Sequence, residues 1–113
     1  MGAQNFLGSP CAPSPLRINN AAAAGDTPLV AAVAGQSVRV YGLRLSVAGA
    51  TIVQIKRGST VLEVFNFAAA GGAAVLDLRE LPYYTTAANE ALVLNSSGAV
   101  QVDGQLEYTQ AKA

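Results

Sequence analysis

The chain has 113 residues, a length that suits one domain with a single hydrophobic core. Only 12% of the residues are charged, about half the usual share of roughly 25%, and seven basic residues balance seven acidic ones. Without a net charge or a cluster of Lys and Arg, the chain does not suit nucleic acid or an anionic membrane surface as a partner. The scarcity of charge predicts a surface that other subunits cover, so we expect an oligomer. The alternative is a monomer whose exterior is mostly Ala and Thr.

The composition also restricts the chemistry. The sequence contains no His, which excludes nucleophiles activated by His and metal sites that need an imidazole. Its single Cys cannot form a thiolate zinc site within one chain. A carboxylate pair drawn from Asp77, Glu80 and Glu90 could serve a hydrolase, but the charged outer face of an edge strand beside a proline turn explains Asp77 and Glu80 more simply. We expect no enzymatic activity, no metal and no cofactor.

The first part of the chain differs in composition from the rest. Pro10, Pro13 and Pro15 fall within six residues. Because proline fixes φ and biases the preceding residue towards extended conformations, we expect an extended arm with polyproline II character over residues 1–28. The folded domain is then expected over residues 29–113. The PxxP spacing in the arm also permits SH3-type recognition, although a plain extended arm is the simpler interpretation.

Cys11, the only cysteine, lies in this predicted arm. The N-terminus lacks the features of a secretory signal, and no apolar run is long enough to span a membrane, so we expect synthesis in a cytosol. There Cys11 would stay reduced as a small linker residue. The alternative is an intermolecular disulfide, formed after the assembly leaves the cell, that locks one subunit's arm to its neighbour.

From Leu29 onward the hydrophobic period is two, and turn signals recur about every eight to twelve residues. This pattern predicts an all-β, antiparallel sandwich or jelly roll of about seven or eight short strands, with no helix longer than about a turn. Along the last strand, the even-numbered residues from Val100 to Tyr108 are expected to face one way and the odd-numbered residues the other. Within residues 74–79, Leu76 and Leu78 are expected to face inward. Other expected strands cover residues 29–33, 51–56, 60–67 and 91–95.

One expected strand changes its inward face part-way along. Val38 and Val40 are even-numbered, whereas Leu43 and Leu45 are odd-numbered. A β-bulge at Gly42 would account for this change, because one extra residue reverses the alternation.

Tyr83 and Tyr84 follow Pro82 and are candidates for a contact patch. Aromatic side chains are enriched in interfaces and can also bind sugars. An equally good interpretation is a loop that caps the end of the sandwich with one ring folded inward.

Four segments carry a resemblance to a known family. They read LVAAVAGQSVRVYGLRLSVAGA, KRGSTVL, AAGGAAVLDL and TTAANEALVLNSSGAVQVDGQLEYT. In hydrophobic pattern and turn spacing they resemble a small, jelly-roll-like β-sandwich of tailed-bacteriophage virion proteins, of the capsid decoration or cement type. The resemblance covers about the last three-quarters of the chain and leaves out the arm with Cys11.

This resemblance implies a homotrimeric decoration protein on the outer surface of a phage head, made in the bacterial cytoplasm. Its partners would be copies of itself and the major capsid protein or another virion protein. The interface candidates come from the residues described above and not from the resemblance. They are Pro10, Cys11, Pro13, Pro15, Tyr83 and Tyr84. The same family also implies an alternative, a tail, baseplate or fibre module that binds a host glycan or another tail protein.

Overall fold

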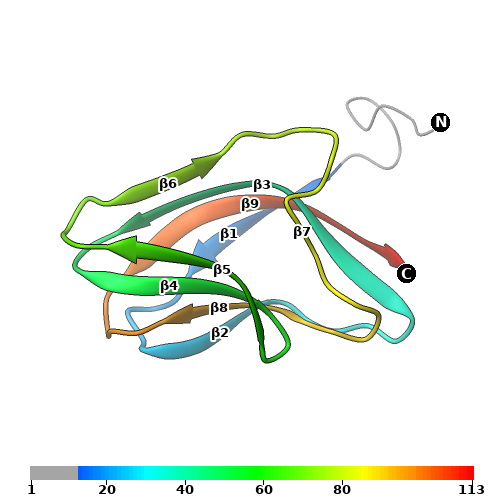
Figure 1. Ribbon diagram of the computed structural model, residues 1–113, viewed down its shortest axis with the longest axis horizontal. Coiled ribbons are helices and arrows are strands. Elements are labelled where there is room, and N and C mark those ends of the chain that lie inside the picture. Colours follow the sequence, from blue (N-terminus) through cyan, green and yellow to red (C-terminus); the bar gives the residue numbers. More distant parts are fainter. Residues whose placement is uncertain (1–12) are drawn as a thin grey trace.

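The computed structural model describes residues 13–113 (Figure 1). This part of the chain forms nine strands and no helix, and the strands make two antiparallel sheets packed as a sandwich. The predicted all-β sandwich is therefore confirmed. No helix in the described range could cross a membrane. The strands are β1 (Ser14–Asn19), β2 (Gly25–Val30), β3 (Gln36–Val47), β4 (Thr51–Arg57), β5 (Thr60–Phe67), β6 (Ala73–Leu76), β7 (Tyr84–Thr85), β8 (Leu92–Ser96) and β9 (Val102–Lys112).

The strand order identifies the sandwich as a jelly roll. The first sheet has the order β1-β9-β3-β6, with β7 also paired to β3, and the second has the order β2-β8-β4-β5. Four of the antiparallel pairs join an earlier strand to a later one in reverse order: β1–β9, β2–β8, β3–β6 and β4–β5. The strands β1 to β4 thus run beside the returning strands β5 to β9 as one two-stranded ribbon. Rolling this ribbon over itself produces the two sheets of a jelly roll.

The core lies between the two sheets and follows the predicted alternation. Its most buried members are at most 1% exposed: Ile18, Val38, Val40, Leu43, Val53, Ile55, Leu92, Leu94, Val102 and Leu106. Burying one such side chain contributes about 1.5–3 kcal/mol. The prediction is wrong at Leu78, which is 45% exposed, because β6 ends at Leu76 and the chain then leaves the sheet.

The predicted change of face in β3 is also present. Val40 pairs with Tyr108 and Gly42 pairs with Glu107, so Tyr41 is the extra residue of a β-bulge. Glycine leaves room beside it, because a Cβ on Gly42 would lie 2.6 Å from the Oε1 atom of Glu107 and 3.3 Å from the Cα atom of Leu78. The bulge keeps both halves of this long strand directed into the core.

Part of the predicted arm belongs to the sandwich. Within residues 1–28, the stretch from Ser14 onward supplies β1 and most of β2, which are edge strands of the first and second sheet. Pro15 and Pro28 are compatible with these strands, since an edge strand has one side without ladder hydrogen bonds. Residues 1–12 of the arm lie outside the described residues.

Candidate interaction surface

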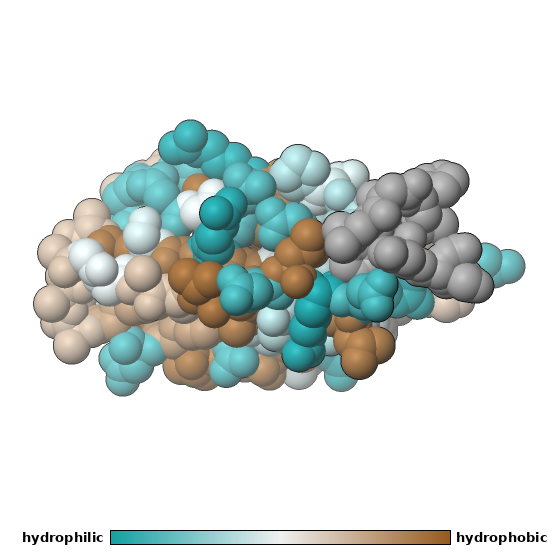
Figure 2. Space-filling view, turned by 90° about the horizontal axis from the view of Figure 1, so that it is seen from above, coloured by the Kyte–Doolittle hydropathy of each residue, from teal (hydrophilic) through white to brown (hydrophobic). Residues whose placement is uncertain are grey.

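Exposed apolar side chains gather along the side of the sandwich formed by β5, β6 and the loop after β6. Exposed fractions are 43% for Val61, 50% for Val64, 59% for Val75, 45% for Leu78 and 72% for Leu81. We call these five residues the β5–β6 flank. Figure 2 looks onto the side where β6 lies in Figure 1 and shows hydrophobic residues in the middle of this face. Pale residues lie at the end where the β5–β6 turn is found.

Both strands of the flank are sheet edges. Among the strands that the structure describes, β5 pairs only with β4, and β6 pairs only with β3. Proteins usually protect such edges with proline, lysine or a covering loop. β5 contains eight residues with no proline and a single charged residue, Glu63. Its backbone edge is therefore open to pairing with another strand.

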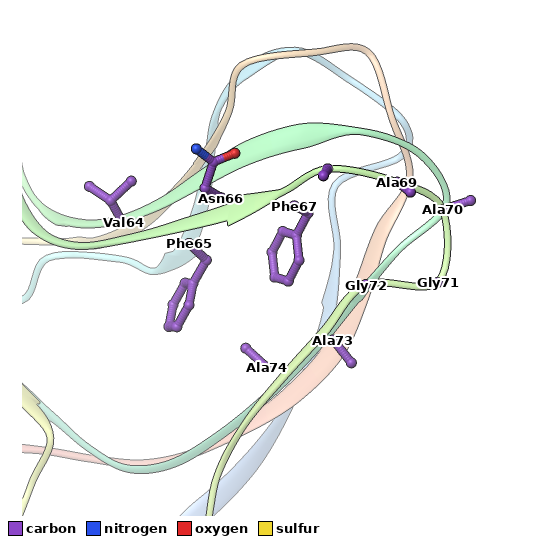
Figure 3. A pocket seen from close by; sticks show the side chains of 11 residues that line it. Val64, Phe65, Asn66, Phe67, Ala69, Ala70, Gly71, Gly72, Ala73 and Ala74 are labelled. Carbon is purple, nitrogen blue, oxygen red and sulfur yellow. The ribbon is translucent and has the colours of Figure 1, made fainter.

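A groove of about 590 Å³ separates the two edge strands. Residues 64–74 line it, and none of them is charged. Phe65 and Phe67 point from β5 towards the segment that carries Ala73 and Ala74 (Figure 3). The two rings are stacked, with their centroids 6.3 Å apart and an interplanar angle of 20°. The groove thus has an aromatic wall that faces alanines.

The turn between β5 and β6 lines one end of the groove and is attached to the end of β3. The backbone N–H of Gly71 donates to the carbonyl of Val47 at 2.8 Å, and the N–H of Val47 donates to the carbonyl of Gly72 at 3.0 Å. Gly71 has a φ of 84°, which favours glycine. A Cβ on Gly72 would lie 2.7 Å from the Cδ1 atom of Phe67. These glycines therefore serve the geometry of the turn.

The loop after β6 is fixed in place although its tip is apolar. The guanidinium carbon of Arg79 lies 3.6 Å from the ring centroid of Tyr83, a cation–π contact. The Nε atom of Arg79 donates to the carbonyl of Leu81 at 2.8 Å, and the hydroxyl of Tyr83 donates to the carbonyl of Asp77 at 2.7 Å. The backbone N–H groups of Arg79 and Tyr83 donate hydrogen bonds to carbonyls of β3 and so attach the loop to the sheet. Leu81 is therefore an exposed side chain on a preorganised loop.

The two tyrosines do not form an exposed pair. Tyr84 is 8% exposed, and its hydroxyl donates to the Oε1 atom of Glu63 at 3.2 Å, which joins β7 of one sheet to β5 of the other. Burial, together with the nearby carboxylate, raises the pKa of Tyr84 well above its ordinary value of 10.0. Tyr83 is half-buried, and Arg79 covers one face of its ring. Tyr84 is thus the inward ring of a capping arrangement.

Among the carboxylates considered for a hydrolase, Glu90 lies in a different part of the molecule from Asp77 and Glu80. Asp77 and Glu80 lie exposed in the loop after β6. Glu90 accepts a hydrogen bond from the backbone N–H of Ala87 at 2.7 Å. Its Oε1 atom lies 3.8 Å from the Nη1 atom of Arg57, beside the β4–β5 hairpin. Within residues 13–113, no group of three or more His, Cys, Asp or Glu side chains could hold a metal ion.

The remaining interface candidates lie at or before β1. Pro13 is half-buried and precedes β1, whereas Pro15 is exposed within it. Pro10 and Cys11 lie outside the described residues, so the disulfide hypothesis stays a prediction.

Phe65, Phe67 and Leu81 were not singled out from the sequence. The sequence did contain one indication of this surface. β5 carries apolar side chains on both faces, Val61 and Val64 on one and the two phenylalanines on the other. A strand that is apolar on both faces, yet sits at a sheet edge, indicates a contact surface.

Comparison with protein families finds no family model that matches the chain, and comparison with curated proteins finds no matching relative. The function must therefore be inferred from the residues of the chain itself.

Proposed function

We propose that the chain is a non-enzymatic structural protein that self-associates through its β5–β6 flank, as a homotrimeric decoration protein on the head of a tailed bacteriophage. The observation that carries this proposal is the flank itself, an open sheet edge beside an uncharged groove and a fixed apolar loop. Exposed apolar surface of this kind marks a protein contact site in a soluble protein.

The composition supports the same function. A chain with 12% charged residues and no net charge has little to keep its copies apart, and association would cover the flank. Jelly rolls are common in viral capsid domains, which agrees with the family that the sequence resembles. The fold is also found in lectins and other proteins, so it supports the proposal by analogy.

The alternative, a tail module that holds a glycan on Tyr83 and Tyr84, has less support. Sugar-binding platforms use exposed ring faces. Here Tyr84 is buried, and one face of the Tyr83 ring is covered by Arg79. Specific binding of the protein to a glycan on an array would support this alternative.

The decoration role is tested on phage particles prepared with and without the protein. Both preparations are heated, and release of the packaged DNA is followed by a fluorescent dye. We expect particles that carry the protein to retain DNA to a higher temperature, because each bound trimer ties neighbouring shell subunits together through several contacts. Equal release temperatures, with the protein shown to be bound, would contradict the role.

A further inference from the structure

We propose that the segment around Phe6–Leu7 of a second copy adds to the free edge of β5 and fills the groove between β5 and β6. This inference rests on the proposed self-association, and it names the contact that would hold the copies together. Addition of an extended segment to an exposed sheet edge is a common way for a protein to bind a peptide.

The receiving strand offers apolar surface on both of its faces. Phe65 and Phe67 pair with Val53 and Thr51, which are buried, so the rings lie on the core side of the sheet. Val64 pairs with Gln54 on the opposite side and is half exposed. A strand added beside β5 would therefore meet apolar side chains on its inner and its outer face.

The sequence before Pro10 suits this position. Residues 3–9 contain no charged residue and no proline, so every backbone N–H in the segment can donate to a neighbouring strand. Phe6 and Leu7 are adjacent, and adjacent side chains of a strand point to opposite faces. One would cover the aromatic wall of the groove while the other lies beside Val64. An uncharged segment also matches a groove whose lining residues carry no charge.

Chain length favours a second copy as the source of the segment. Phe6 lies seven residues before Pro13, a stretch that spans at most about 23–25 Å. β1 and β6 are the two edges of the first sheet, three strand spacings or about 14 Å apart, and β5 lies in the other sheet, about 10 Å further on. The shortest surface route is thus about 24 Å. A fully stretched segment has no length left to turn the sheet edge and run along β5 of its own chain.

The test uses full chains and the single native thiol. A chain with a nitroxide on Cys11 is co-refolded with ¹⁵N-labelled chain that carries Cys11→Ser, and amide signals of the ¹⁵N chain are recorded by NMR. We expect the nitroxide to broaden signals of residues 64–74 more strongly than signals of β2, the opposite edge of the same sheet as β5. Phe6→Ser together with Leu7→Ser in the nitroxide chain should remove the broadening.

A matched pair of substitutions tests the groove. Ala73 lines the groove and Ala31 lies away from it, and both are exposed. Ala73→Glu in the ¹⁵N chain should abolish the broadening, whereas Ala31→Glu should leave it unchanged. Equal effects of the two substitutions would overturn the assignment of the groove.

The outcomes also separate this inference from the proposed function. Broadening that occurs only when nitroxide and ¹⁵N are in the same chain would overturn docking between copies. No broadening in a sample whose mass is that of a trimer would overturn the docked segment and leave the proposed self-association intact. A monomer in every sample would contradict both.

Discussion

At the scale of single residues, one amide side chain joins the two halves of the ribbon where both pass from one sheet to the other. Asn20 is 3% exposed, and its Nδ2 atom donates to the carbonyls of Ala23 at 3.3 Å and Val100 at 2.8 Å. Its Oδ1 atom accepts from the N–H groups of Ala22 at 3.1 Å and Val102 at 2.8 Å. Asn20 thereby fixes the β1–β2 turn to the connection between β8 and β9.

We expect Asn20→Ala to lower the free energy of unfolding by about 2–4 kcal/mol, because it leaves buried backbone groups near Val100 and Val102 without partners. Urea denaturation measures the change. Asn19→Ala is the matched control, since Asn19 is exposed, and its effect should stay below about 1 kcal/mol. Equal losses for the two variants would show that burial of the Asn20 network does not stabilise the fold.

The buried tyrosine predicts a loss of stability at alkaline pH. Because the pKa of Tyr84 is raised in the folded state, the folded protein keeps the phenolic proton at a pH where the unfolded chain loses it. The contribution of the protonated Tyr84 hydroxyl to the free energy of unfolding is therefore complete below pH 10.0. It falls as the pH rises above this value, by at most about 1.4 kcal/mol per pH unit.

Urea unfolding at pH 8 and pH 11 tests this prediction. Tyr84→Phe should be less stable than the native chain at pH 8, because Glu63 loses its hydrogen bond. It should also lose less stability between the two pH values. An identical pH dependence in both proteins would contradict the assignment of this group.

At the scale of elements, the sequence predicts β4, β5 and β8 well and places the edge strands β1, β2 and β6 poorly. The bulge in β3 could be predicted because the parity of its buried residues changes between Val40 and Leu43. The strand β1 was hidden because a proline-rich composition favours an arm, while a sheet edge tolerates Pro15 and still buries Ile18 completely. The end of β6 was missed because alternation continues to Leu78 after pairing has stopped.

The candidate surface was only partly accessible to sequence reasoning. The composition predicted a covered surface, but alternation does not show which edge strands meet across the sandwich. The groove depends on β5 and β6 lying at the same side of different sheets, which is a property of the jelly-roll topology. The inward turn of Tyr84 likewise depends on Glu63, a residue of the opposite sheet.

The edge of β5 provides the sharpest prediction at this scale. Val64→Lys places a charge on the half-exposed outer face of β5, so it should raise the concentration at which the oligomer dissociates by at least about tenfold, or about 1.4 kcal/mol. Analytical ultracentrifugation over a dilution series measures this concentration. Val33→Lys is the matched control, because Val33 is 41% exposed and lies outside the flank, and it should change little. Equal shifts in both variants would remove the flank as the interface.

At the scale of the whole molecule, the proposed contact is heterologous, since a segment of one copy meets the groove of another. Such contacts close into a ring when the rotation between copies allows it, and otherwise they grow into filaments. A ring of three would cover all three flanks and leave other faces of each sandwich available to a shell protein.

The most direct test of self-association is the mass of the full chain in solution, measured by multi-angle light scattering with and without reductant. Each chain has a mass of 11.5 kDa, and we expect a particle of about three chains in both conditions, because the contacts on the flank require no disulfide. Loss of the trimer in reductant would place the contact at Cys11 instead. A monomer of 11.5 kDa at every concentration would contradict self-association through the flank.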